Sequence, residues 1–184
     1  RKTDAGFEVD FDDLDKKLES AKVLMLCTPH NPTGTVFSDE DLRRMGELCV
    51  KHDAYIVADA IHADLLAPPR RHTYIASISP EIADRTITLI APSKSFNLAG
   101  LSTSSYIIPN DGLRERFAKE VDDTHIRGGN NFGNIASIAA YECGEEWLDE
   151  ANAYIAANME YVKSFIAENL PSVKAYNGGG TYLM

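Results

Sequence analysis

The chain has 184 residues, of which 44% are apolar and 25% are charged, and its formal net charge at pH 7 is -10. This length and composition are ordinary for a soluble globular protein with one sizeable core. The acidic balance argues against a nucleic-acid partner, because phosphate binding needs clustered Lys and Arg side chains. With no apolar run as long as a membrane span and no basic leader pattern, we expect a cytoplasmic protein without a membrane partner. The spacing of Cys27, Cys49 and Cys143 predicts neither a metal site nor a disulfide, so we expect reduced core cysteines.

Helix-start signals stand at several positions of the chain. Asp10 precedes apolar residues spaced three and four apart, and its carboxylate can cap a helix there. Ser38, with Asp41 three residues later, resembles a capping box, and Asn110 stands before a further amphipathic segment. A short helix is expected at residues 80–84. These signals predict helices that separate the strands.

Three nearly continuous apolar runs, at residues 22–28, 54–61 and 86–91, are typical of strands that are buried on both faces. A fourth strand is expected at residues 104–108. Strands and helices alternate with short connections between them. The sequence therefore predicts an α/β fold, a three-layer α/β/α arrangement around a mostly parallel sheet.

The last third of the chain has a different pattern. A glycine-rich loop at 127–131 precedes helix-compatible sequence from 133 to 170, with an expected break at Cys143-Gly144. Two strands around a glycine turn are expected at 172–176 and 181–184. This end of the chain is therefore predicted to leave the parallel sheet.

We divide the chain into two parts. Residues 1–128 are predicted to form part of a large domain, and residues 129–184 to supply interdomain helices and the start of a smaller α+β C-terminal domain. The chain opens at Arg1 without a methionine and stops at Met184 inside an expected strand. We therefore expect it to be a central segment of a longer protein.

Polar side chains follow the three apolar runs. Asn31, Asp59 and Lys94 each lie at or just after the end of a different predicted strand. Parallel strands bring such ends to one edge of the sheet, where open α/β proteins hold their ligands. Lys94 is expected where a buried strand meets a loop, a partly dry place in which desolvation favours the amine form.

Pyridoxal phosphate is a cofactor that needs this set of groups. Its aldehyde needs a lysine, its ring nitrogen a carboxylate and its phenolic oxygen a hydrogen-bond donor, which Lys94, Asp59 and Asn31 can supply. Each residue also has a purely structural explanation. Lys94 can extend its ammonium to the surface, Asp59 can cap the next helix, and Asn31 can simply form an Asn-Pro turn.

The segments around these residues resemble a known family. Residues 31–34 (Asn-Pro-Thr-Gly), 59–62 (Asp-Ala-Ile-His) and 93–97 (Ser-Lys-Ser-Phe-Asn) are similar, in order and spacing, to motifs of the fold type I pyridoxal-phosphate enzymes of aminotransferase class I and II. Within that family they look most like the MalY/PatB-like cystathionine β-lyase (C–S lyase) branch. The resemblance implies that the first part of the chain belongs to the large domain of a pyridoxal-phosphate-dependent transferase fold.

The resemblance implies a role for each site residue. Lys94 binds the cofactor aldehyde and is catalytic, Asp59 pairs with the pyridinium nitrogen, and Asn31 donates to the ring oxygen. His62 stands where typical aminotransferases carry a tyrosine, and a neutral histidine can donate the same hydrogen bond. A histidine behind a buried strand is, alternatively, often only a satisfied core residue. Ser93 is the expected phosphate contact, and no metal ligand is implied.

Some positions depart from the family pattern. Ser102 stands where aminotransferases commonly have an arginine for the cofactor phosphate, Ala91 replaces a common serine, and Ala60 replaces a glutamate frequent in the lyase branch. The family's phosphate loop, ring-stacking tyrosine and substrate-carboxylate arginine are expected outside these 184 residues. We therefore expect the segment alone to bind the cofactor weakly and to be inactive.

The resemblance implies an enzyme, a pyridoxal-phosphate-dependent carbon–sulfur β-lyase acting on cystathionine or other cysteine S-conjugates. At full length it implies a cytoplasmic homodimer with a small sulfur-containing amino acid as substrate. The nearest alternative is a class I/II aminotransferase, which uses the same residues up to the carbanion. A second alternative is a regulatory or interaction protein on the same fold. A plain nucleotide-binding domain is disfavoured, because no Gly-x-Gly-x-x-Gly follows a predicted strand.

Overall fold

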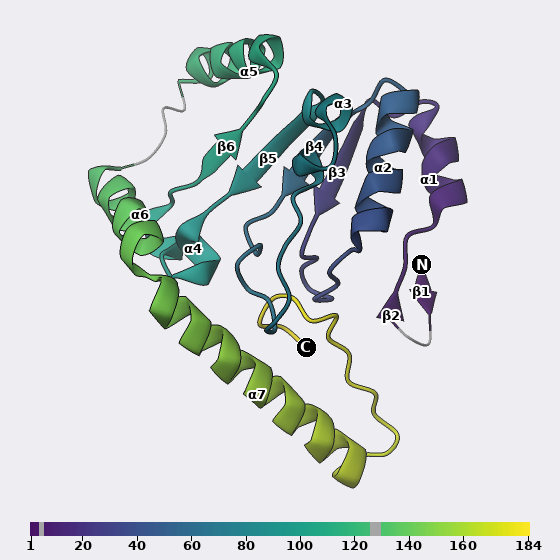
Figure 1. Ribbon diagram of the computed structural model, residues 1–184, viewed down its shortest axis with the longest axis vertical. Coiled ribbons are helices and arrows are strands. Elements are labelled where there is room, and N and C mark those ends of the chain that lie inside the picture. Colours follow the sequence, from purple (N-terminus) through teal and green to yellow (C-terminus); the bar gives the residue numbers. More distant parts are fainter. Residues whose placement is uncertain (4–5, 126–129) are drawn as a thin grey trace.

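The computed structural model describes residues 1–3, 6–125 and 130–184 (Figure 1). Within them a sheet has the strand order β3-β4-β5-β6, with bounds β3 (Val23–Cys27), β4 (Tyr55–Asp59), β5 (Thr86–Ile90) and β6 (Ser105–Ile107). β3, β4 and β5 are parallel, and β6 runs antiparallel to β5. The predicted α/β fold with a mostly parallel sheet is confirmed.

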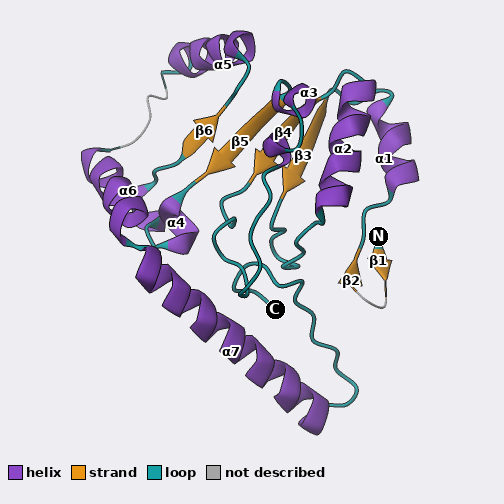
Figure 2. Ribbon diagram, in the orientation of Figure 1, coloured by secondary structure: helices purple, strands orange, loops and turns teal. Residues whose placement is uncertain are grey.

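Helices connect and flank these strands (Figure 2). Their bounds are α1 (Phe11–Leu18), α2 (Asp39–Lys51), α3 (Pro80–Ala83), α4 (Pro92–Ser95), α5 (Asp111–Asp123), α6 (Asn131–Cys143) and α7 (Glu145–Asn169). Two 3-10 turns, η1 (Ile75–Ser77) and η2 (Ala99–Leu101), and a hairpin of β1 (Lys2–Thr3) and β2 (Gly6–Phe7) complete the described elements. The break expected between α6 and α7 is confirmed at Gly144.

The core lies between one face of the sheet and the helices α1, α2 and α3. Leu42 and Cys49 of α2 pack with Ile56 of β4, and all three residues are buried. The apolar residues of α2 recur on one helical face, and that face lies against the sheet. The opposite face of β3 is open in the described part of the chain, where Met25 is 82% exposed. Only one helical layer therefore covers β3 here.

The three cap predictions are confirmed by hydrogen bonds. The Asp10 carboxylate accepts from the Asp13 amide at 3.2 Å, and the Asn110 side chain accepts from the Leu113 amide at 2.7 Å. At the start of α2, Ser38 Oγ accepts from the Asp41 amide at 3.1 Å. These side chains satisfy amides that lack a partner inside the first turn of a helix.

Three other predictions are corrected. Lys94 lies in the one-turn helix α4 and not in a loop, because Pro92 at the first helical position is pre-organised for a helix. Residues 172–176 and 181–184 do not form the expected strands; isolated bridges pair nearby glycines with distant loops instead. Cys143 is exposed rather than in the core, although all three cysteines are free as expected. The domain boundary after residue 128 and most of the 127–131 loop lie outside the described residues.

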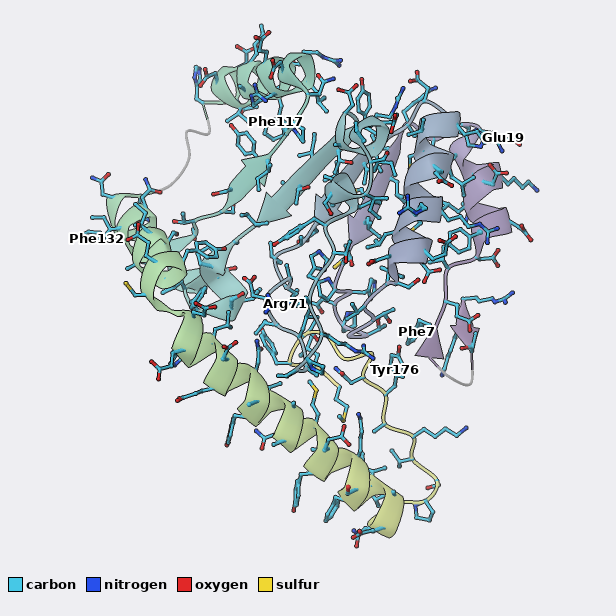
Figure 3. The ribbon with its side chains drawn as sticks, viewed as in Figure 1. Phe7, Glu19, Arg71, Phe117, Phe132 and Tyr176 are labelled. Atoms are coloured by element: carbon cyan, nitrogen blue, oxygen red, sulfur yellow. The ribbon has the colours of Figure 1, made fainter. Side chains whose placement is uncertain are left out.

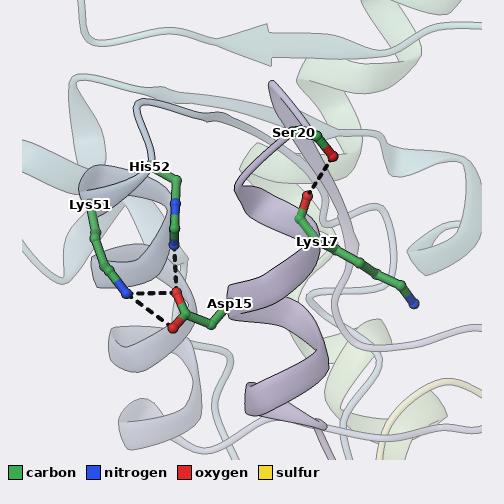
Figure 4. A network of polar contacts seen from close by, with 5 residues as sticks. All are labelled: Asp15, Lys17, Ser20, Lys51 and His52. Carbon is green, nitrogen blue, oxygen red and sulfur yellow. Dashed lines mark hydrogen bonds and ion pairs between the residues drawn. The ribbon is translucent and has the colours of Figure 1, made fainter.

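A polar cluster joins α1 to α2 on the outer surface (Figure 4). Lys51 Nζ donates to both carboxylate oxygens of Asp15, at 2.8 and 3.0 Å, and His52 Nε2 lies 2.5 Å from the same carboxylate. We call these residues the Asp15 cluster. Its lysine and aspartate side chains are exposed, and such surface pairs contribute little to stability.

Candidate active site

The ends of β3, β4 and β5 lie at one edge of the sheet. Cys27, Asp59 and Leu89 are in register across these strands. The Thr28 amide then donates to the Asp59 carbonyl at 3.0 Å, so the ladder continues to the last residue of β4. Asn31 and Lys94 follow β3 and β5 at this same edge, as the sequence predicted.

His62 connects the polar groups of this edge. Its ring is 2% exposed, and its Nε2 lies 3.3 Å from Nδ2 of Asn31. An amide nitrogen can only donate, so Nε2 accepts and the neutral ring carries its proton on Nδ1. Nδ1 is buried and has no hydrogen-bond partner among the described residues. His62 is therefore not the satisfied core histidine of the alternative explanation.

The charges of two predicted site residues act on this ring. Burial lowers the pKa of His62, the Lys94 ammonium lowers it further, and the Asp59 carboxylate opposes them. Both charges are therefore close enough to His62 to affect its protonation. The imidazole is neutral at neutral pH, because burial and the neighbouring ammonium both disfavour its cation.

Contacts within the described residues use only part of the hydrogen-bonding capacity of the Asp59 carboxylate. Its Oδ1 accepts from the Ile61 amide at 3.2 Å, a local turn contact of the kind that the structural explanation expects. Within the described part of the chain, Lys94 Nζ forms no hydrogen bond or ion pair. The hydroxyl of Thr28, which is 1% exposed, is also without a partner there. The edge thus presents polar groups that its own chain leaves free.

Ser93 and Ser95 flank Lys94 in α4 and differ in their surroundings. Ser93 is partly buried. Ser95 is buried, and its hydroxyl donates to Oδ2 of Asp64 at 2.9 Å. Sequence reasoning missed Asp64, although a carboxylate in the apolar stretch after β4 is a signal that could have singled it out. This contact fixes the helix that carries Lys94 to the segment that carries His62.

Tyr182 is a further residue that sequence reasoning missed. Its ring lies 5.9 Å from the ring of His62, with an angle of 69° between the ring planes. The two residues are 120 positions apart in the sequence, so no local pattern could have paired them. The end of the chain therefore reaches the candidate site.

The donor set at this edge fits pyridoxal phosphate. An amine, a carboxylate and an amide beside a neutral imidazole match an aldehyde, a ring N–H and a phenolic oxygen in chemical type. Lys94 Nζ and His62 Nδ1, which have no hydrogen-bond partner among the described residues, support this fit because they are available to a ligand. The fold and this edge define the class: an α/β protein with a lysine-centred site at the carboxyl ends of parallel strands.

The chain belongs to the aminotransferase class I and II family, whose profile matches residues 1–178. Over 183 residues it is 42% identical to "Cystathionine beta-lyase PatB" of Bacillus subtilis, covering 98% of this chain and 47% of that protein. It is 35% identical to a cystathionine beta-lyase of Corynebacterium glutamicum, and this match covers 96% of this chain and 47% of that protein. The chain thus spans about half the length of these curated relatives.

Solved structures give the same picture. Cystalysin from Treponema denticola, described as containing a pyridoxal 5'-phosphate cofactor, matches with a TM-score of 0.94 and 38% identity over 99% of this chain and 47% of that one. The pyridoxal-phosphate-bound C–S lyase of Staphylococcus hominis matches with a TM-score of 0.88 and 35% identity. This match covers 97% of this chain and 45% of that one. In the described residues, no helix is long and apolar enough to cross a membrane.

Proposed function

We propose that the protein containing this chain is a pyridoxal-phosphate-dependent carbon–sulfur β-lyase that acts on cystathionine or related cysteine S-conjugates. The observation that carries the proposal is the meeting of Asn31, Asp59 and Lys94 around one buried histidine, His62. The names of the relatives, which include cystathionine beta-lyases of two genera, support the choice of reaction.

Each site residue has a proposed task toward the cofactor. Lys94 holds the aldehyde, Asp59 keeps the ring nitrogen protonated, and Asn31 donates to the phenolic oxygen. His62 orients the Asn31 amide, and its own neutral ring adds a donor without adding a charge. Ser93, one residue before the lysine, contacts the phosphate. When bound, pyridoxal phosphate supplies an electron sink for the pair released at Cα of an amino acid.

The chain contributes proton transfer and charge balance to this reaction. With pyridoxal phosphate bound, Lys94 Nζ would be the base that takes the proton from the substrate Cα. The negative charge of Asp59 would balance the protonated ring nitrogen of the cofactor. The substrate Cβ–S bond then breaks, and the sulfur leaves as a thiolate with the bonding electrons. The remaining aminoacrylate hydrolyses to pyruvate and ammonia.

An aminotransferase is the second candidate function. The family itself and a similar structure from Clostridium difficile, described as a putative aminotransferase (TM-score 0.95, 34% identity), favour it. The two reactions differ in where the proton goes after its removal from Cα. Incubation of the longer protein with cystathionine separates the two reactions. A lyase releases pyruvate when no keto-acid acceptor has been added. An aminotransferase needs such an acceptor and forms no pyruvate from cystathionine.

The setting of the enzyme is also a proposal. We infer a cytoplasmic homodimer at the full length of the relatives, with a small sulfur-containing amino acid as its substrate and neither nucleic acid nor membrane as partner. The net charge of -10 supports the exclusion of nucleic acid. The 184-residue chain alone is expected to bind the cofactor weakly and to lack turnover. Tight stoichiometric binding by this chain, seen by equilibrium dialysis, would contradict that expectation.

A further inference from the structure

Residues 177–182, which we call the C-terminal strap, return to the candidate site after α7 (Figure 1). The strap lies between two loops. On one side Gly179 bridges Thr35, in the loop that carries Asn31. On the other side Gly180 bridges Leu66, in the segment that carries His62. The strap therefore joins the two loops whose side chains meet at the Asn31–His62 hydrogen bond.

Backbone hydrogen bonds hold both sides of this junction. The Gly180 amide donates to the Gly34 carbonyl at 2.9 Å. The Thr181 amide donates to the Leu65 carbonyl at 2.8 Å, and the Ala67 amide donates to the Gly179 carbonyl at 2.9 Å. Thr181 is 4% exposed, so these bonds are shielded from water. Such shielded backbone hydrogen bonds fix the positions of the strap and the two loops relative to one another, because breaking one bond would leave buried polar groups unpaired.

The glycines of the strap allow this close approach. A Cβ on Gly178 would lie 2.5 Å from the Gly34 carbonyl oxygen, and one on Gly180 would lie 2.8 Å from Cβ of Pro29. Both distances are shorter than any carbon contact tolerates. The strap can therefore lie directly on the loop after β3 only because these positions carry no side chain.

Asn177 fixes the shape of the strap. Its Nδ2 donates to the carbonyls of Gly180 and Leu183, at 3.1 and 2.6 Å, and its Oδ1 accepts from the Gly179 amide at 2.7 Å. The neighbouring Tyr176 also packs edge-on against Phe7, with ring centroids 5.5 Å apart (Figure 3). One side chain thus closes the turn at three places, and the residue before it anchors the turn to the N-terminal hairpin.

We propose that Asn177 and Tyr182 are positioning residues, which act through the strap and the Tyr182 ring to hold the Asn31–His62 pair in its donor geometry. The inference rests on the proposed function, because it assigns the purpose of that geometry to cofactor binding. Neither residue is required to touch the cofactor. The strap lies near the end of residues 129–184, where the sequence predicts the start of the smaller C-terminal domain, so it also couples the site to that domain.

The test follows the pKa of His62 by NMR titration of the histidine-labelled 184-residue chain, without cofactor. Loss of the strap's turn in Asn177→Ala frees Tyr182 from His62 and lets water reach the ring. The His62 pKa then rises toward its ordinary value, because water at the ring weakens the effect of burial that lowers it. The matched control is Asn169→Ala, because Asn169 also donates from Nδ2 to a carbonyl, that of Phe165, but at the exposed end of α7.

A second variant covers the possibility that Asn177→Ala does not fold. Tyr182 is 44% exposed, so Tyr182→Leu is expected to fold, to be checked by circular dichroism, and to raise the His62 pKa as well. A His62 pKa equal to that of the unmodified chain in a folded Tyr182→Leu variant overturns the proposal. Because this readout needs no cofactor, its outcome is independent of whether the longer protein proves to be a lyase.

Discussion

Two polar clusters of this molecule use the same kinds of residues and differ in how completely they are paired. The Asp15 cluster contains an aspartate, a lysine and a histidine, and on the outer surface Lys51 and His52 both contact the Asp15 carboxylate. The edge of the sheet also brings an aspartate, a lysine and a histidine together, namely Asp59, Lys94 and His62. There, within the described residues, the lysine amine has no hydrogen-bond or ion-pair partner and the buried His62 Nδ1 is unpaired.

The difference separates a structural cluster from a binding site. Charges that satisfy one another need no ligand, and at the surface they contribute little. Buried polar atoms without partners cost stability, and a ligand that pairs with them offsets this cost. The predictions below test this distinction by making equal substitutions in both clusters.

Lys94→Ala is expected to have the largest effect. Without its amine the longer protein loses both the anchor for the aldehyde and the base at Cα, so pyruvate release should fall by at least about 10²-fold. Lys51→Ala is the matched control, because Lys51 occupies the corresponding place in the Asp15 cluster. Steady-state kinetics of both variants decide the point. Comparable losses in the two variants would contradict the distinction.

His72 provides the second test, because its buried Nε2 also has no hydrogen-bond partner among the described residues, although it lies outside the proposed site. Burial lowers the pKa of His72 to about 4. As the pH falls below 6.5 the unfolded chain gains a proton that the folded chain resists, so stability is lost progressively until about pH 4. The loss from this residue is at most roughly 3 kcal/mol.

His72→Phe keeps the ring that packs on Tyr74 and removes the titrating nitrogen. Urea unfolding at a series of pH values should show a shallower loss of stability between pH 6.5 and 4 than in the parent chain. His125→Gln, at an exposed position, serves as the control and should leave the slope unchanged. An unchanged slope in His72→Phe would mean that its nitrogen is hydrated or liganded.

Asp59→Asn should weaken cofactor binding by about tenfold, or ~1.4 kcal/mol, because an amide cannot balance a protonated ring nitrogen. The same exchange in the other cluster, Asp15→Asn, should leave cofactor affinity as it was. Fluorescence titration of the longer protein with pyridoxal phosphate measures both. Equal affinities for Asp59→Asn and the parent would remove Asp59 from the site.

The smallest effect is expected for the stability of Asp15→Asn. Hydrogen bonds from Lys51 and then His52 lower the pKa of the Asp15 carboxyl in the folded chain. A carboxyl with a lowered pKa stabilises the fold above its unfolded value, and this contribution disappears as the pH falls through the folded value. The parent should therefore be slightly more stable than Asp15→Asn at pH 7, with the gap closing below about pH 4. A gap that widens in acid would contradict this.

Much of the fold was predictable because its signals are local. Apolar runs marked β3, β4 and β5, and cap residues such as Ser38 marked the helices between them. Since parallel strands share one edge, the positions of Asn31, Asp59 and Lys94 in the sequence were enough to predict where they meet. Their roles toward a cofactor remain predictions.

The features that sequence reasoning missed depend on contacts between distant residues. The segment after α7 was expected to form strands, but its Gly180 and Thr181 amides donate to the carbonyls of Gly34 and Leu65, which no local pattern indicates. The Tyr182–His62 contact is of the same kind. Cys143 was expected in the core because α6 is apolar, yet the described residues leave much of that helix uncovered.

Borohydride reduction of the longer protein with pyridoxal phosphate, followed by peptide mapping, tests the central claim most directly. The account predicts that the reduced cofactor is attached to Lys94, which the sheet edge holds without a protein partner, and that Lys51 of the paired cluster is not labelled. Label spread evenly over exposed lysines such as Lys22 and Lys51, with none enriched at Lys94, would contradict it.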